Sequence, residues 1–273
     1  MSSVNRKHYF IECRDQRLYA IHFQGQHDKG AVVLCQPFGD EAIKARRVLF
    51  NLASAWAAEG ADVLLVDYAG TGNSTGTFER VTLDTLLEDI GTSIDELRKM
   101  TDKNRITLAG LRFGATAAAL AAEKVTEISN LILLEPVVVP IEYLRESLRA
   151  NLATQMMIFG KVRYNREILE QRILQGKAVD VFGFPLTKEF FSSTSAVDLR
   201  NDVSIFKGKV SIIPISSLKS ARVGKDITEL SEKYERIGAT CDILPARERP
   251  FWNELKEHYV AAEQVFNHVR LIP

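Results

Sequence analysis

The segment ITLAGLRFGATAAALAA, residues 106–122, constrains the fold of this chain more than any other stretch. It joins a short apolar strand to a helix of small residues through a turn that contains Gly110 and Gly114. Glycines at this spacing permit a sharp strand-to-helix turn with close packing, and the residue midway between them is normally a catalytic serine. Here the central residue is Arg112. The frame of the turn is kept, whereas its usual nucleophile is absent.

Short apolar segments alternate with longer helical patterns, which is typical of a largely parallel sheet with helices on both faces. Two strands precede the alternation, so we expect the sheet to begin with an antiparallel hairpin. The predicted strands are HYFIEC, LYAIHF, AVVLCQP, ADVLLVDY, RITLAG, NLILLEP, VSIIPIS and CDILPA. The predicted helices of this part cover residues 43–59, 83–100, 115–124, 227–237 and 254–266.

The alternation is interrupted once, over residues 137–206. This interval contains the helical patterns IEYLRESLRANLATQMMIF and NREILEQRILQG and the apolar stretch VDVFGFPL. It is too long and too regular for a plain loop. We interpret it as a helical cap over the carboxyl ends of the strands, where open α/β sheets bind ligands. The predicted organisation is a core of residues 1–136 and 207–273 with a helical cap of residues 137–206 inserted into it.

The turn around Arg112 is similar to the turn that carries the catalytic serine in the α/β-hydrolase fold. Two further stretches occupy positions expected for that fold. CQPFGDE, residues 35–41, follows the third strand, where an N–H group of the oxyanion hole is normally found, and VDYAGTGNSTG, residues 66–76, follows the fourth. Three landmarks in the correct order are far more specific than one. We therefore predict an α/β-hydrolase fold: a mostly parallel sheet of about eight strands with an inserted helical cap.

The partners of a catalytic serine are missing as well. The segment SIIPISSLKSARVG, which should supply the acid, has no carboxylate before Asp226. The segment CDILPARERPFWNELKEHY, which should supply the basic histidine, has Phe251 and Trp252 where that residue is expected, and His258 lies within a predicted helix. Because a serine nucleophile needs both a base and an acid, the sequence argues against classical serine hydrolysis.

The sequence resembles a particular group within this superfamily, the exosortase A system-associated hydrolases of type two, which belong to bacterial exopolysaccharide gene clusters. The matching stretches lie between about residues 31 and 260 and are QPFGDEAIKARRVLFNLASAWAAEGADVLLVDYAGTGNSTG, GLRFGA, LLEPVV, YLRESLRANLA, ILQGKAVDVFGFPL and PFWNE. Gly39, Asp40 and the N-terminal region depart from the pattern of that group. The resemblance implies a link to exopolysaccharide systems and implies hydrolase ancestry rather than hydrolase activity.

Arg112 is the centre of the predicted ligand pocket, because a helix N-terminus favours an anion and a guanidinium group adds a planar set of donors. Alternatively, Arg112 is paired internally and fills a vacated pocket, with a carboxylate as its partner. The possible partners are Glu135, Asp40 and Glu41. Phe38 and Phe113 are expected to provide the two N–H groups of an oxyanion hole, and Trp252 to fill the place of the base. The predicted pocket residues are Phe38, Asp40, Glu41, Arg112, Phe113, Glu135 and Trp252.

Composition limits the partners of this protein. Lys and Arg together equal Asp and Glu at 35 each, so the overall charge gives no indication of nucleic-acid or anionic-membrane binding. No apolar run reaches the length of a membrane span and the first residues do not resemble a signal peptide, which predicts a cytoplasmic protein. Three widely separated cysteines suggest neither a disulfide framework nor a metal site. We expect no metal and no cofactor.

Three functions remain open from the sequence. The first is a non-hydrolytic protein that binds a small anionic or acyl-bearing ligand or a protein partner. The second is an active hydrolase of the esterase or acyl-transfer type with unusual catalysis, in which Arg112 anchors an anion. The third is a structural partner of a homologous hydrolase or of a second copy. The fold by itself does not choose among them.

Overall fold

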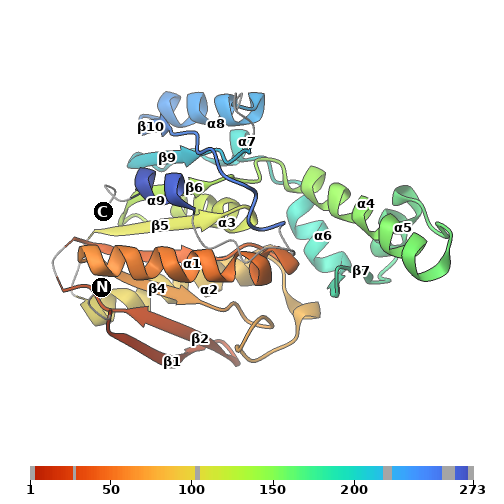
Figure 1. Cartoon of the computed structure of the whole chain (residues 1–273), viewed down its shortest axis with the longest axis horizontal. Coiled ribbons are helices and arrows are strands. Elements are labelled where there is room, and N and C mark those ends of the chain that lie inside the picture. The colour runs from red at the N-terminus through yellow and green to blue at the C-terminus, as the bar shows by residue number, and fades with distance from the viewer. Residues whose placement is uncertain (1–3, 27–28, 102–104, 218–222, 254–261, 270–273) are drawn as a thin grey trace.

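A single twisted sheet lies at the centre of the computed structural model, with helices on both of its faces (Figure 1). The structure describes residues 4–26, 29–101, 105–217, 223–253 and 262–269. The sheet has eight strands in the order β1-β2-β4-β3-β5-β6-β9-β10. All eight predicted strands are therefore confirmed. They are β1 (Arg6–Cys13), β2 (Gln16–Phe23), β3 (Ala31–Cys35), β4 (Asp62–Val66), β5 (Ile106–Leu111), β6 (Ile128–Leu134), β9 (Lys209–Ile213) and β10 (Thr240–Ile243).

The strand directions follow the burial pattern of the sequence. The hairpin β1-β2 is antiparallel, and β2 also pairs antiparallel with β4. From β4 to β10 the pairing is parallel throughout. Every residue of β3, β4 and β5 is buried, as expected for parallel strands with helices on both sides.

Helices from distant parts of the chain cover the two faces of the sheet. Buried residues of α1 and α9 share one apolar cluster, whereas those of α2, α3 and α8 belong to the other. The predicted last helix of the core covers residues 254–266, whereas α9 begins at Glu263, and residues 254–261 lie outside the described part of the chain. The core helices are α1 (Asp40–Glu59), α2 (Leu83–Thr101), α3 (Phe113–Ala122), α8 (Lys225–Arg236) and α9 (Glu263–Val269).

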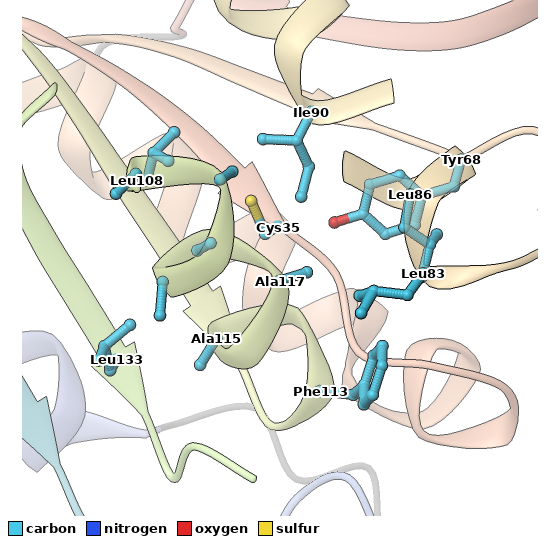
Figure 2. Close-up of a cluster of buried hydrophobic side chains, with 14 of the residues drawn as sticks. Cys35, Tyr68, Leu83, Leu86, Ile90, Leu108, Phe113, Ala115, Ala117 and Leu133 are labelled. Carbon is cyan, nitrogen blue, oxygen red and sulfur yellow. The ribbon is translucent and has the colours of Figure 1, made fainter. Parts of the chain in front are cut away.

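The alanine-rich helix α3 lies at the centre of the larger cluster. Figure 2 shows Ala115 and Ala117 of α3 between Cys35, at the end of β3, and Leu133 of β6. The small side chains of α3 allow its backbone to approach the strands closely. As a result, nine of its ten residues are buried. This packing determines where the turn before α3 is placed.

Between β6 and β9 the chain forms a separate group of elements, the 137–206 segment. It contains α4 (Pro140–Phe159), α5 (Arg166–Leu174), the hairpin of β7 (Val179–Val181) and β8 (Phe184–Leu186), α6 (Lys188–Ser195) and α7 (Leu199–Asp202). In Figure 1, α4 and α5 extend well beyond the end of the sheet. Among the described helices, none is long and apolar enough to cross a membrane.

Candidate functional site

Arg112 lies on the tight turn between β5 and α3, with φ 55° and ψ −123°. Its N–H donates to the carbonyl of Leu134 at 2.9 Å, and its own carbonyl accepts the N–H of Ala115 at 3.0 Å. A non-glycine residue with positive φ is strained, and such strain concentrates at functional sites. The turn therefore holds Arg112 in a strained backbone conformation between β5 and α3.

Both glycines of this turn are required by close backbone approach. A Cβ atom on Gly110 would lie 2.4 Å from the carbonyl oxygen of Gly114. A Cβ atom on Gly114 would lie 2.3 Å from the carbonyl oxygen of Gln36 and 2.4 Å from that of Cys35. Any larger residue would push α3 away from β3 and from the loop that follows it. The spacing GLRFG is thus explained by packing alone.

The side chain of Arg112 is held by one carboxylate and two aromatic rings. Its Nε donates to Glu41 Oε1 at 3.3 Å. Its guanidinium carbon lies 5.4 Å from the ring centroid of Tyr143 and 5.3 Å from that of Trp252. Cation–π contacts at such distances add to the charge pair. Because the Arg112 side chain is 18% exposed, these three partners leave it little contact with solvent.

Burial dominates the electrostatics around Arg112. Burial raises the pKa of the Glu41 carboxyl above its ordinary value, and the adjacent charge of Arg112 partly opposes this rise. Burial also raises the pKa of the Tyr143 hydroxyl, and the charge of Glu41 raises it further. The Glu41–Arg112 pair is therefore an almost buried ion pair, in which the loss of either partner leaves the other poorly compensated.

The other two carboxylates that we considered as partners of Arg112 are bound elsewhere. Asp40 accepts a hydrogen bond from Lys44 Nζ at 2.6 Å. Glu135, which has a positive φ of 40°, accepts the backbone N–H of Ile215 through Oε2. Burial raises the pKa of Glu135, whereas the Ile215 hydrogen bond and the charge of Arg112 lower it. Of the three, only Glu41 forms the ion pair with Arg112 among the described residues.

Phe38 and Phe113 belong to an aromatic cluster between the sheet and the 137–206 segment. The ring of Phe38 stacks on Phe190 with centroids 4.0 Å apart, and it lies 5.8 Å from the ring of Phe113. Within the described part of the chain, the backbone N–H groups of Phe38 and Phe113 have no hydrogen-bond partner. Among the residues that the structure describes, these two backbone N–H groups are therefore unpaired donors next to an aromatic cluster.

A cavity of about 580 Å³ opens beside Arg112. Its lining includes Arg112, Glu135, Tyr143, Ser216 and Asp226. Phe38 and Asp40 do not line this cavity; Phe38 instead lines a separate one of about 210 Å³. Glu41 and Trp252, which both contact the Arg112 side chain, are buried at 6% and 4% exposure. Among the described cavities, the predicted pocket residues are therefore not gathered in the one beside Arg112.

None of the described histidines lines this cavity. His8 contacts Tyr19, His22 pairs with Asp62 at the start of β4, and His268 contacts the carbonyl of Pro245. His258 lies outside the described residues. Within the described ranges, no group of three or more His, Cys, Asp or Glu side chains could hold a metal ion.

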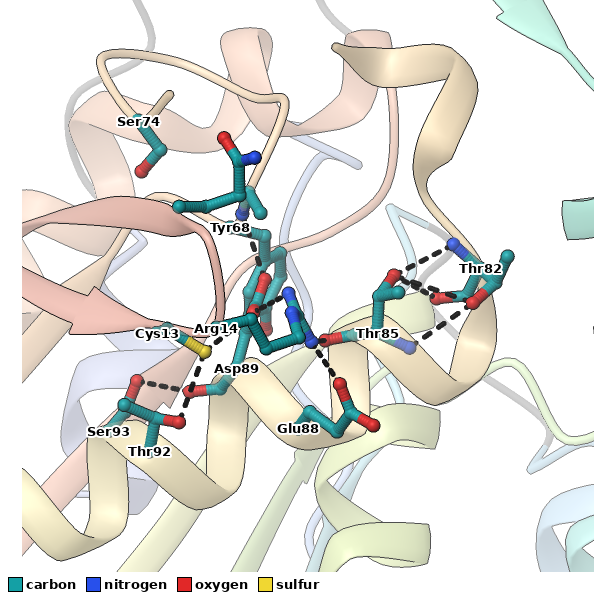
Figure 3. Close-up of polar contacts among 12 residues, drawn as sticks. Cys13, Arg14, Tyr68, Ser74, Thr82, Thr85, Glu88, Asp89, Thr92 and Ser93 are labelled. Carbon is teal, nitrogen blue, oxygen red and sulfur yellow. Dashed lines mark hydrogen bonds and ion pairs between the residues drawn. The ribbon is translucent and has the colours of Figure 1, made fainter. Parts of the chain in front are cut away.

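Two buried aspartates brace the glycine-rich loop after β4. Asp67 accepts the N–H of Asn73 at 2.9 Å and pairs with Arg46 at 2.8 Å. Asp89 of α2 accepts the N–H of Ala69 at 2.8 Å and contacts Arg14 (Figure 3). Sequence reasoning did not identify Asp89 or Tyr143, because each is one polar residue within an ordinary helical pattern.

Comparison with known proteins agrees with this geometry. The family model for serine aminopeptidases of the S33 type matches residues 26–180, which is more than half of the chain. The chain therefore belongs to this family and has the α/β-hydrolase fold. No curated protein sequence matches it.

Several solved structures are similar over most of their length. Est1E from Butyrivibrio proteoclasticus with bound ferulic acid has 18% identity and a TM-score of 0.66, with 96% of each chain covered. An esterase of Pyrococcus furiosus has 17% identity and a TM-score of 0.64, with 90% of this chain and 82% of the esterase covered. DcsB in complex with a substrate analogue has 14% identity and a TM-score of 0.66, with 97% of each chain covered. At these identities the similarity shows the fold alone.

Proposed function

We propose that this chain is a non-hydrolytic member of its family that binds a small anionic or acyl-bearing ligand beside Arg112. The observation that supports this most directly is the contact between Arg112 and Trp252. In a serine hydrolase of this fold, the residue on the turn is the nucleophile and a histidine after the last strand removes its proton. Here a guanidinium group lies against an indole ring. Neither group can serve as nucleophile or as base near neutral pH.

The same site keeps features that suit binding. The cavity beside Arg112 is within the size range of small-molecule sites. The N–H groups of Phe38 and Phe113 remain available as donors, and aromatic side chains surround them. We propose that the 137–206 segment is a cap over this site and that residues 1–136 and 207–273 form the core. The proposed link to bacterial exopolysaccharide systems is supported by sequence resemblance alone.

A second candidate function is hydrolysis or acyl transfer with unusual catalysis. The observation that favours it is Glu135, a carboxyl with a raised pKa that lines the same cavity as Arg112. A carboxyl of this kind is suited to proton transfer, and Arg112 would stabilise the developing negative charge. The first candidate function involves no turnover, whereas the second requires turnover in which Glu135 transfers a proton.

Hydrolysis of p-nitrophenyl acetate, butyrate and octanoate by four proteins distinguishes these functions: wild type, Arg112→Ser, Arg112→Met and Glu135→Gln. We expect no turnover by any of them, because a serine without a base stays an ordinary alcohol. Turnover by Arg112→Ser alone would show that a working base is present. Wild-type turnover that both Arg112→Met and Glu135→Gln abolish would establish the second candidate.

Binding is tested by calorimetric titration with octanoate and with octylamine, which have the same chain length and opposite charge. We expect octanoate to bind the wild type, and Arg112→Met to weaken this binding by about tenfold or more through loss of a charge-assisted contact. Octylamine controls for the apolar contribution. Equal binding of the two probes, or octanoate binding that survives in Arg112→Met, would contradict an anion site at Arg112.

A further inference from the structure

The end of α4 has a concentration of exposed apolar side chains found nowhere else in the described part of the chain. Eight of the thirteen exposed large apolar residues lie between residues 156 and 174. Met157 is 84% exposed and Ile158 is 66% exposed. We define the apolar tip as Met156, Met157, Ile158, Phe159, Val162 and Tyr164. Exposed apolar patches of this kind mark interaction sites on soluble proteins.

The apolar tip is an ordered structure and not a frayed helix end. Gly160 ends α4 in the left-handed conformation, and its N–H donates to the carbonyl of Met156 at 2.9 Å. The buried side chain of Gln155 accepts the N–H groups of Arg163 and Tyr164, both at 2.8 Å, through Oε1. Its amide nitrogen donates to the carbonyl of Tyr164 at 2.9 Å. The chain thus folds back on α4 and holds the apolar side chains outward.

The shape of the apolar tip argues against a flat protein partner. Successive helical residues are rotated by about 100°, so the four residues from Met156 to Phe159 point in nearly all directions around α4. One flat or grooved surface could not cover all four. Figure 1 shows α4 and α5 extending away from the sheet, which leaves this end of the molecule free to enter a soft medium. A lipid interface would surround a projecting tip on every side.

Charge around the apolar tip differs from that of the chain as a whole. Residues 156–177 contain five basic residues and two acidic ones, although the net charge of the chain is zero. The guanidinium carbon of Arg163 lies 3.6 Å from the ring centroid of Phe159, and that of Arg172 lies 4.6 Å from the Tyr164 ring. Basic side chains beside exposed aromatic and aliphatic residues are typical of segments that enter the headgroup region of anionic membranes.

We propose that the apolar tip and its flanking basic residues dock this protein onto the surface of a membrane that contains anionic lipids. The apolar side chains enter the boundary between headgroups and acyl chains, and the basic side chains contact the headgroups. Pairing of the tip with a second copy is disfavoured, because it would bring two positively charged segments together. This inference is independent of the function proposed for the cavity.

Vesicle flotation with the full chain tests this proposal, using vesicles of phosphatidylcholine and of an equimolar mixture with phosphatidylglycerol. We expect binding to the mixed vesicles that weakens as salt is added. The double variant Met157→Gln with Ile158→Gln should bind at least about tenfold more weakly. Lys161→Gln with Arg163→Gln should bind more weakly to the mixed vesicles and lose the preference for them. As a matched control, Ile43→Gln with Ile205→Gln alters two residues of 68% and 63% exposure elsewhere and should bind normally.

A second measurement reports insertion directly. Both native tryptophans are buried, at 3% and 4% exposure, so the variant Met157→Trp adds an exposed fluorophore at the apolar tip. We expect its emission to shift to shorter wavelength when mixed vesicles are added. Absence of vesicle binding, or equal binding to both kinds of vesicle, would overturn the proposal. Self-association that the Met157/Ile158 double variant abolishes, without any vesicle binding, would identify the occupant as a second copy.

Discussion

Replacing Arg112 by methionine isolates the ion pair on the turn between β5 and α3. Methionine keeps an unbranched stem beside the Tyr143 and Trp252 rings and leaves the backbone strain at this position in place. The change therefore removes the charge and the N–H donors. Glu41, whose side chain is 8% exposed, is then left without its countercharge. Breaking a buried pair in this way typically costs about 3 to 5 kcal/mol of unfolding free energy.

The cost should depend on pH in a direction that the structure determines. Burial raises the pKa of Glu41 and Arg112 opposes the rise, so the pKa in Arg112→Met should be higher still. A carboxyl with a folded-state pKa above its unfolded value makes the folded state bind more protons. Stability is therefore lost as pH rises from the unfolded pKa towards the folded one. We expect Arg112→Met to be closest to wild type near pH ~4.5 and to fall further behind towards neutral pH.

Equilibrium unfolding in urea across this pH range, with two further variants, checks the reasoning. Arg112→Lys keeps the charge and should recover part of the loss at neutral pH. The double variant Arg112→Met with Glu41→Gln removes the stranded carboxylate and should be more stable than Arg112→Met alone. A loss in Arg112→Met that is the same at every pH, or a double variant that is no more stable than the single one, would refute the role assigned to Glu41.

Three further predictions concern the scaffold of the site, and urea unfolding measures each of them. Because Arg112 has φ 55°, Arg112→Gly should be more stable than Arg112→Ala by about 1 to 2 kcal/mol, the reverse of the order in an ordinary helix; equal stabilities would show that the turn is unstrained. Gly114→Ala should cost about 2 to 3 kcal/mol of unfolding free energy through contact with the Gln36 carbonyl. As a control, Gly91→Ala in α2, which has open space around it, should stabilise the protein by up to about 1 kcal/mol. Similar effects at the two positions would contradict the close approach of α3. Asp89→Asn should cost about 2 kcal/mol through its weakened bonds to Ala69 and Arg14, and an unchanged stability would mean that Asp89 does not hold the loop.

Much of the fold could be predicted from the sequence, because its signals are local. Fully buried parallel strands have continuous apolar sequences such as VLLV in β4, and the turn before α3 is marked by two glycines that backbone contact requires. The pairs formed by Arg112 depend on tertiary geometry instead. Asp40 and Glu41 are neighbours on α1, yet the rotation of a helix by about 100° per residue directs one towards Lys44 and the other towards Arg112.

Two other features lay outside the reach of sequence reasoning for different reasons. Tyr143 contacts Arg112 from a helix whose position over the sheet is set by long-range packing, so nothing in the pattern IEYLRES distinguishes it. The basic segment from residue 156 to 177 was hidden because the prediction used the charge of the whole chain, which is zero. Only the structure shows that these residues adjoin an exposed apolar helix end.

The strained turn at Arg112 is not in itself a sign of catalysis. The contacts of Gly110 and Gly114 force the chain to turn sharply wherever α3 packs this closely on β3 and β5, whichever residue stands between them. The Arg112 N–H bond to Leu134 and the Ala115 bond to the Arg112 carbonyl are backbone bonds, and they too do not depend on the side chain. The backbone contacts that hold this turn therefore do not depend on a nucleophilic side chain at position 112. What distinguishes a hydrolase from a binding protein on this fold is the side chain that the turn presents and the group that meets it, and here these are a guanidinium and an indole.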